Sequence, residues 1–322
     1  MEVLNGYQQT YALRAALELD LFTQIAEGAT TPEDIAAAVD ASPRGIRILC
    51  DYLAILGLLT KLDGTYGLSR DAKLFLDARS PGYLGASARF LAQDGMIESF
   101  RHLTTTVRRG GADGPGTLGP DDPVWVEFAR SMAPMMAMQA EAVARLLPAS
   151  RRSPRVLDIA AGHGLFGLAI AQHNPEARIV AVDWDNVLQV ARENAAQAGA
   201  TDRYTTIAGS AFDVDLGSDY QVILLPNFLH HFDAETNVRL LRRLHDAIAP
   251  DGVMATIDFV PDETRIAPPL AGAFALTMLG STPAGDAFTF AELDAMFRDA
   301  GFGESRMQDL EPTPHRLILT QP

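Results

Sequence analysis

Two adjacent histidines, His230 and His231, stand directly after an apolar run in the sequence LPNFLHHFD (225–233). The run YQVILL (220–225) has the composition of a buried strand, and the end of such a strand has no structural need for two imidazoles. An imidazole has a pKa near neutrality and can accept a proton from an attacking group, so His230 is a candidate general base. For His231 two interpretations stay open, a direct part in the chemistry or packing and hydrogen bonding within a turn.

A general base needs a partner that orients its second ring nitrogen. Asp258 ends another apolar run, GVMATID, and the carboxyl ends of parallel strands meet at one edge of a sheet. We therefore expect Asp258 to lie beside His230 and to orient it.

A second motif whose residues could bind a ligand lies earlier in the chain, in the sequence DIAAGHGLFG that begins at Asp158. Glycines between a strand and a helix allow a ligand to approach the backbone closely. Asp183 ends the following strand-like run, where an acid can accept hydrogen bonds from both hydroxyls of a ribose. The pattern therefore predicts a site for an adenosine-like ligand.

The glycines Gly162, Gly164 and Gly167 also match the G-x-G-x-x-G pattern of dinucleotide sites, which alone is a weak signal. The carboxylate of Asp158 would repel a pyrophosphate, whereas it suits a ligand with an ammonium or sulfonium group. This weighs against a nicotinamide dinucleotide and a dehydrogenase.

The elements that must position these residues are predicted by hydrophobic pattern. From Arg155 onward, strand-like runs alternate with helical segments, which indicates a parallel sheet covered on both faces. The tail differs, because GFGESRMQDL and PTPHRLILTQP predict two strands joined as an antiparallel pair. The fold class is therefore α/β.

The first part of the chain predicts a winged-helix-like arrangement. Two helix starts, TTPEDIAAAV and ASPRGIRILC, are followed by a hairpin pattern at Asp63-Gly64. Residues 1–80 contain 7 Lys/Arg and 11 Asp/Glu, a net charge of 7 − 11 = −4, which disfavours DNA binding. A helical dimerisation domain at residues 1–85 is the better interpretation.

For residues 86–150 the sequence pattern predicts a helical linker that contributes to a substrate pocket. We expect a catalytic domain to follow at residues 151–322. The Gly/Pro/Asp stretch 108–123 reads as a loop. A Met- and Phe-rich stripe follows it, and such a stripe is either core or an adaptable pocket wall.

The whole-chain composition excludes several classes of protein. The net charge of −15 argues against nucleic acid and against an anionic membrane surface as partners. Cys50, the single cysteine, lies in an apolar helical pattern and is expected to be a core residue. No signal peptide, no membrane span and no metal-ligand spacing is recognisable, so we expect a cytoplasmic, metal-independent protein.

The motifs VLDIAAGHG (156–164), VDW (182–184) and AGSAFD (208–213) together resemble those of class I S-adenosyl-L-methionine-dependent methyltransferases. With the winged-helix-like front, nearly the whole chain resembles the small-molecule O-methyltransferases of plants and bacteria, such as the caffeate and hydroxyindole enzymes. The resemblance implies a Rossmann-like catalytic domain with seven strands. It also implies an intertwined homodimer, a small-molecule acceptor and S-adenosyl-L-homocysteine as product.

The resemblance assigns the cofactor site residue by residue. Gly162 and Gly164 would pass under the amino-acid part, Asp183 would hold the ribose and Trp184 would lie against the adenine. The full set of implied cofactor residues is Asp158, Ala160, Gly162, Gly164, Asp183, Trp184, Ser210, Ala211, Phe212 and Pro226.

Several positions depart from the usual motifs of that family. Ser210 stands where an Asp is usual, Ala160-Ala161 replaces two glycines, and Pro226 stands where many relatives carry Lys. His231 replaces an acid after the base, and Asp258 matches a family Glu. A second family Glu would fall near Ala287, where the adjacent Asp286 is the possible substitute.

The acceptor pocket is expected to be apolar, with Asn227 as a polar member that fixes the orientation of the acceptor. Its candidate residues are Phe128, Met132, Met135, Asn227, His231, Phe274, Met278 and Leu279. Three readings compete with a hydroxyl acceptor: an N- or C-methyltransferase acting by proximity, a non-catalytic ligand-binding regulator, and the dehydrogenase that Asp158 disfavours.

Overall fold

The computed structural model describes residues 2–113, 122–147 and 154–322 and divides the chain into two compact units, Met1–Ile97 and Glu98–Pro322. The division falls inside the segment predicted as a linker (86–150). Residues 114–121 of the predicted loop 108–123 lie outside the described residues. So do residues 148–153, across which the predicted start of the catalytic domain falls.

The first unit is helical with one small hairpin. Thr31 begins α3 by accepting a hydrogen bond from the backbone N–H of Asp34, and Asp63-Gly64 turns the hairpin in left-handed backbone conformations. Cys50 is buried in the core of this unit, and burial raises the pKa of its thiol to about 12. The elements are α1 (Glu2–Glu18), α2 (Leu21–Ala26), α3 (Pro32–Ala38), α4 (Pro43–Ile55), β1 (Leu59–Leu62), β2 (Thr65–Leu68), α5 (Arg70–Phe75) and α6 (Gly85–Leu91).

The second unit is built on a seven-stranded sheet in the order β5-β4-β3-β6-β7-β9-β8. The pairs among β3 to β7 are parallel, and β9 is antiparallel to both β7 and β8. This confirms the predicted α/β fold and the antiparallel tail. The strands are β3 (Arg155–Ile159), β4 (Arg178–Asp183), β5 (Tyr204–Ala208), β6 (Tyr220–Pro226), β7 (Ile248–Asp258), β8 (Ser305–Asp309) and β9 (Arg316–Thr320).

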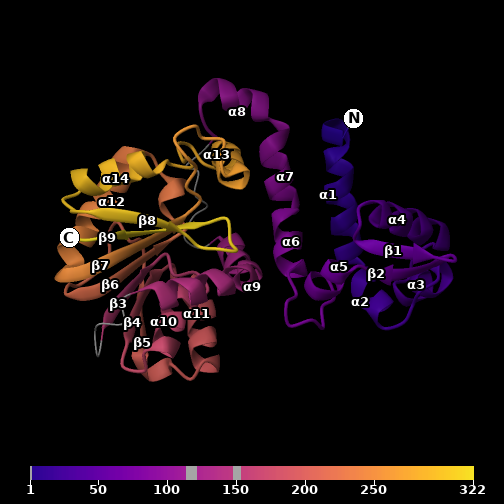
Figure 1. Cartoon of the computed structure of the whole chain (residues 1–322), viewed down its shortest axis with the longest axis horizontal. Helices are drawn as coiled ribbons and strands as arrows, with labels where there is room; N and C mark the ends of the chain where they lie inside the picture. The colour runs from indigo at the N-terminus through magenta and orange to yellow at the C-terminus, as the bar shows by residue number, and fades with distance from the viewer. Residues whose placement is uncertain (1, 114–121, 148–153) are drawn as a thin grey trace. The chain divides into compact units, whose positions relative to one another are not determined.

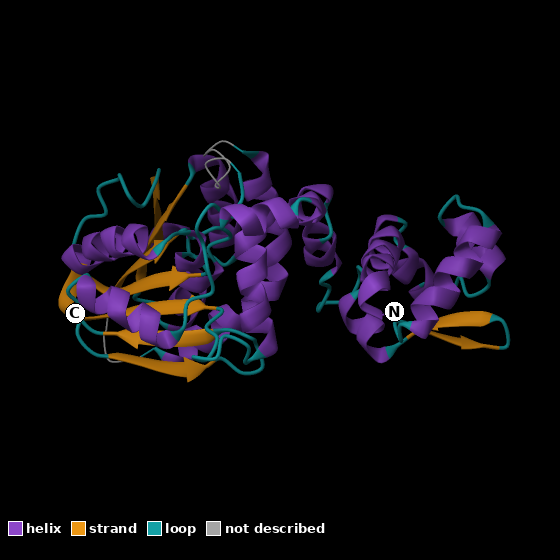
Figure 2. Ribbon diagram, turned by 90° about the horizontal axis from the view of Figure 1, so that it is seen from above, coloured by secondary structure: helices purple, strands orange, loops and turns teal. Residues whose placement is uncertain are grey.

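Helices cover both faces of this sheet, as Figures 1 and 2 show. One face packs through fully buried residues such as Ile223 and Leu225 against Leu240, Leu241 and Phe297 of α12 and α14. α9, α10 and α11 lie on the other face (Figure 1). The helices of this unit are α8 (Leu103–Arg109), α9 (Pro123–Leu146), α10 (Leu165–His173), α11 (Asp185–Gln197), α12 (Ala234–Ala247), α13 (Pro269–Ser281) and α14 (Phe290–Asp299), and α7 (Asp94–Arg101) spans the division.

The strand order reverses at β3, because the chain runs outward through β4 and β5 and then returns to β6 on the other side. At such a point the loops after neighbouring strands diverge and leave a crevice at the carboxyl ends of the strands. Within the described residues, no helix is long and apolar enough to cross a membrane.

Candidate active site

The turn after β3 lies at this carboxyl edge of the sheet. Ala160, Gly162 and Gly164 have positive φ angles of 50°, 56° and 74°. A Cβ at Gly164 would overlap the hydroxyl of Tyr204, whereas a Cβ at Gly162 would meet nothing closer than 3.8 Å. The chain therefore needs glycine at 164 for its own packing, and at 162 it leaves space beside the backbone where a ligand can lie.

Ala160 departs from glycine in the same turn. A left-handed conformation costs a non-glycine residue about 1 kcal/mol or more, so this turn carries local strain beside the site.

Two carboxyl groups face this turn, the buried Asp158 and the half-buried Asp183. Asp158 is fully buried, and its Oδ2 accepts a hydrogen bond from the backbone N–H of Gly167 at 3.0 Å. Its Oδ1 has no partner among the residues that the structure describes. Burial, with a smaller effect of the charge on Asp183, raises the pKa of Asp158 to about 8.

Asp183 ends β4 and accepts hydrogen bonds from the backbone N–H groups of Gly162 and Trp184, at 2.8 and 2.7 Å. Burial raises the pKa of this carboxyl to about 6, against the opposing effect of the two N–H donors. Asp183 therefore ties the turn after β3 to the end of β4 and can accept further hydrogen bonds on its remaining lone pairs.

The predicted adenine-side residues lie around the ends of β4, β5 and β6. Trp184 is half-buried and packs with Val187 of α11. Ser210 accepts a hydrogen bond from the backbone N–H of Phe212 at 3.1 Å, so its hydroxyl serves the local turn. Ala211 is buried beside it, and Pro226 is the last residue of β6.

His230 and Asp258 form a buried pair at the ends of β6 and β7. Nδ1 of His230 lies 2.7 Å from Oδ1 of Asp258, and the side chains are only 6% and 5% exposed. The backbone N–H of Phe259 donates to the same carboxylate oxygen at 2.8 Å and holds it in place. Because Nδ1 donates its proton to a carboxylate, Nε2 is the nitrogen with a free lone pair.

His231 lies beside this pair within a cluster of rings. Its ring centroid is 4.4 Å from that of His230 and about 6.3 Å from those of Trp125 and Phe228. Burial, and in second place the neighbouring His230, lowers the pKa of His231 well below its ordinary value. His231 is therefore a neutral imidazole at physiological pH.

Asp286, considered as the substitute for a missing acid, makes other contacts. Its carboxylate accepts from the backbone N–H of Ala287 at 2.8 Å and lies 3.5 Å from the guanidinium of Arg265. Its own backbone N–H donates to the carbonyl of His230 at 3.0 Å. Asp286 thus fixes the backbone of His230, and its carboxylate is engaged by Arg265.

The predicted acceptor residues come from α9, α13 and the strand ends. The ring of Phe274 stands edge-on to His230 with centroids 4.8 Å apart. Met132 and Met278 are buried, whereas Met135 is half-buried and Phe128 is 36% exposed. Leu279 is half-buried.

Sequence reasoning missed Met136 and Trp125. The amide of Asn227 donates to the sulfur of Met136 at 3.7 Å, and Met136, unlike Met135, is buried. The helical period accounts for the burial of Met136, since a residue four positions after the buried Met132 lies on the same face of α9. Trp125 had no signal in the sequence, because its contact with His231 joins two distant segments.

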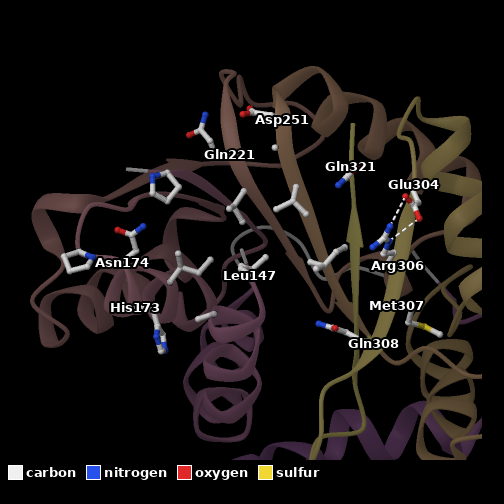
Figure 3. A pocket seen from close by; sticks show the side chains of 18 residues that line it. Leu147, His173, Asn174, Gln221, Asp251, Glu304, Arg306, Met307, Gln308 and Gln321 are labelled. Carbon is white, nitrogen blue, oxygen red and sulfur yellow. Dashed lines mark hydrogen bonds and ion pairs between the residues drawn. The ribbon is translucent and has the colours of Figure 1, made fainter. Parts of the chain in front are cut away.

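The second unit also contains a cavity of about 820 Å³, which is separate from the site residues described above (Figure 3). Its lining includes Pro154, Asn174 and Gln221, which stand at the amino ends of β3, β4 and β6. It therefore lies at the opposite edge of the sheet from His230 and the turn after β3.

Two family models match the sequence. One, the O-methyltransferase domain, covers residues 100–303, and the other, the O-methyltransferase dimerisation domain, covers residues 1–78. The chain belongs to the O-methyltransferase family.

Individual relatives agree with this membership. This O-methyltransferase is 28% identical to the tetracenomycin polyketide synthesis 8-O-methyl transferase of Streptomyces glaucescens, over 95% of this chain and 91% of that protein. The solved structure of a candidate O-methyltransferase from Nostoc punctiforme is 47% identical, with a TM-score of 0.95 over 99% of this chain and 97% of that one.

The structure of PigF with S-adenosylhomocysteine is also similar. It is 25% identical, with a TM-score of 0.88 over 100% of this chain and 98% of that one. PigF of Serratia is an S-adenosyl-L-methionine-dependent methyl transferase. This O-methyltransferase likewise uses S-adenosyl-L-methionine.

The residues present fit that cofactor. The unpartnered, buried oxygen of Asp158 suits a cationic ammonium group, and the open side of Gly162 admits a ligand against the backbone. Among the described residues, no group of His, Cys, Asp and Glu side chains is arranged to hold a metal ion.

Proposed function

We propose that this enzyme transfers the methyl group of S-adenosyl-L-methionine to a hydroxyl of a small aromatic acceptor in secondary metabolism, with His230 as general base. The observation that carries the proposal is the 2.7 Å contact between His230 and Asp258 at the carboxyl ends of β6 and β7. The names of relatives that methylate polyketide and naphthoate hydroxyls support the acceptor class.

The cofactor would be held at the turn after β3. Gly162 and Gly164 would bring the backbone against its amino-acid part, Asp183 would accept from its ribose hydroxyls, and Trp184 would cover its adenine. When bound, S-adenosylmethionine supplies a methyl group on a positively charged sulfur that is open to direct displacement.

His230 would act on the hydroxyl of the acceptor. Its Nε2 lone pair accepts the hydroxyl proton as the oxygen attacks, and the new positive charge on the imidazole is balanced by Asp258 across the Nδ1–H bond. Burial of both side chains keeps water away from this pair. Alignment of the reacting groups supplies the rest of the rate enhancement.

A neutral His231 serves the same reaction. It adds no positive charge next to a cationic methyl donor, and it offers one donor and one acceptor to an acceptor molecule. Trp125, Phe274 and Met132 would supply the apolar walls.

The test is methyl transfer from labelled S-adenosylmethionine to a panel of phenols, catechols, quinols and aromatic amines. We expect His230→Ala to lower kcat on a hydroxyl acceptor about 10²–10⁴-fold, the contribution of a general base. His173→Ala, which replaces a half-exposed histidine paired with Glu141, is the control and should leave kcat unchanged.

Equal kcat values for His230→Ala and the wild type on a hydroxyl acceptor would contradict the role of His230 as general base. Transfer only to nitrogen or carbon acceptors would contradict the hydroxyl specificity, since an amine with a free lone pair needs no strong base.

A further inference from the structure

Gln139 of α9 and His315, the residue before β9, form a buried polar pair that the proposed reaction does not use. Nε2 of Gln139 lies 2.9 Å from Nδ1 of His315, and the two residues are 2% and 3% exposed. They are 176 positions apart in the chain, so only the tertiary fold brings them together.

The pair borders the acceptor side of the proposed site. The ring centroids of His315 and Phe259 are 4.0 Å apart. Phe259 in turn stacks on Phe274 with centroids 4.1 Å apart, and Phe274 contacts His230. Gln139 lies about one helical turn beyond Met136 on the same buried face of α9, and Met136 contacts Asn227. Both members of the pair are thus linked by contacts to residues that flank the base.

Each member keeps one polar atom without a partner in the described part of the chain. These atoms are Oε1 of Gln139 and Nε2 of His315, and Oδ1 of Asn227, whose amide contacts Met136, also lacks a partner there. A buried polar atom without a hydrogen bond is rare and destabilises the fold, so several of them together require an explanation.

The hydrogen-bond inventory shows what such a cluster can bind. Burial lowers the pKa of His315 to about 4. The charge on Asp258 opposes this shift and His230 adds to it, so the imidazole of His315 is neutral at physiological pH. With the Gln139 amide donating to Nδ1, Nε2–H of His315 is a free donor and Oε1 of Gln139 a free acceptor. If the amide is turned the other way, the free donor and acceptor exchange places, and the pair still presents one of each.

We propose that Gln139 and His315 form a subsite that binds a second hydroxyl group on the aromatic acceptor. This inference rests on the proposed function and specifies its substrate. A hydroxyl both donates and accepts one hydrogen bond, so it satisfies both free atoms, whereas an ether or carbonyl oxygen satisfies only the donor. Met136, with its flexible unbranched side chain, can change rotamer to admit the substituent.

The probes are a naphthol, the dihydroxynaphthalenes that carry a second hydroxyl, and the methoxynaphthols in which that hydroxyl is blocked. Their dissociation constants are measured by calorimetry on the full-length enzyme with S-adenosylhomocysteine bound, and methylation rates are measured separately. We expect at least one dihydroxynaphthalene to bind about 10-fold or more tightly than both the naphthol and the corresponding methoxynaphthol.

The variants are Gln139→Met, His315→Phe and the double variant, which keep approximate size and, at 315, an aromatic ring in contact with Phe259. Each is expected to abolish the preference for the second hydroxyl. The double variant removes every free polar atom of the pair, so it should recover thermal stability relative to the single variants without recovering the preference. Thr320→Val, which removes a buried hydroxyl bonded to Ser305 at the far end of β9, is the matched control and should keep the preference.

Binding that prefers the second hydroxyl, and loses the preference in the variants, supports the subsite even if methylation is slow. Methylation of these acceptors without any binding preference would overturn the subsite and leave the proposed function standing. An unchanged preference in the double variant would mean that the pair holds only a structural water, and absence of binding by every probe would overturn the subsite for this acceptor class.

Discussion

At the scale of single residues, the chemistry of the site depends on which ring nitrogen of His230 carries the proton. Asp258 accepts from Nδ1, and its second donor, the backbone N–H of Phe259, prevents it from turning away. The carboxylate thus selects the tautomer in which Nε2 is a base and stabilises the imidazolium that forms after proton transfer.

Asp258→Asn should therefore lower kcat about 10²–10⁴-fold, because an amide can donate to Nδ1 and favour the wrong tautomer. The affinity for S-adenosylhomocysteine should change little, since Asp258 stands at the end of β7, apart from the turn after β3. The two quantities are measured by initial rates and by calorimetry.

Asp286→Asn is the matched control for this prediction. The sequence suggested Asp286 as a second acid at the site. Its carboxylate is instead paired with Arg265 and not with the imidazole of His230. An equal loss of kcat in both variants, or no loss in Asp258→Asn, would remove the orienting role of Asp258.

At the scale of elements, the segment between α13 and α14 is held against the base by its backbone. The N–H of Asp286 donates to the carbonyl of His230, and the N–H of Gly285 donates to the hydroxyl of Thr282 at 2.8 Å. A Cβ on Gly285 would overlap the carbonyl of His230, so only glycine allows this approach.

Gly285→Ala should push this segment away from His230. We expect a loss of about 1–3 kcal/mol in the free energy of unfolding from overpacking. A fall in kcat of up to about 10²-fold should follow from the displaced base. Denaturant unfolding and initial rates measure the two effects.

Gly280→Ala in α13 is the control, because its added Cβ would make only ordinary contact with Phe100, at 3.6 Å. This variant should be as stable as the wild type or more so, since alanine has a higher helix propensity than glycine. A Gly285→Ala enzyme as stable and as active as Gly280→Ala would show that the close approach is unimportant.

How much of this arrangement could be predicted from the sequence depends on the kind of contact. His230, Asp258 and Asp183 were predictable because strand periodicity locates strand ends, and parallel strands bring their carboxyl ends to one edge. The fold class followed from the same alternation of elements. The pairing of Gln139 with His315 was not predictable, because it joins side chains that are 176 positions apart and leaves no periodic signal.

At the scale of the whole molecule, the first unit carries apolar side chains that its own core does not use. Val3, Leu4 and Tyr7 on α1 are 93%, 70% and 61% exposed, and Ile55 at the end of α4 is 79% exposed. Exposed apolar residues that are neighbours on one helix, as Val3, Leu4 and Tyr7 are at the start of α1, are typical of association surfaces. The match of residues 1–78 to a dimerisation domain supports a homodimer formed through this unit.

Asp158 and Asp183, the two carboxyls beside the turn after β3, make the stability of the cofactor-free enzyme depend on pH. Burial raises the pKa from an ordinary 3.8 to about 6 for Asp183 and to about 8 for Asp158. The folded state thus binds protons at these two groups more tightly than the unfolded state, so their contribution to the free energy of unfolding is greatest below about pH 4. It falls as pH rises to about 6 through Asp183 and to about 8 through Asp158.

Asp158→Asn should therefore flatten the fall in Tm between about pH 6 and about pH 8, because the amide keeps an acceptor for the N–H of Gly167 without carrying a charge. The half-buried Asp262, whose pKa is lowered chiefly by the hydroxyl of Thr264, is the control, and Asp262→Asn should not flatten the curve. The measurement is Tm against pH without cofactor. A parallel decline in Asp158→Asn and the wild type would mean that Asp158 is already ionised at neutral pH. Its charge would then have to be balanced within the folded protein, without the help of a cationic ligand.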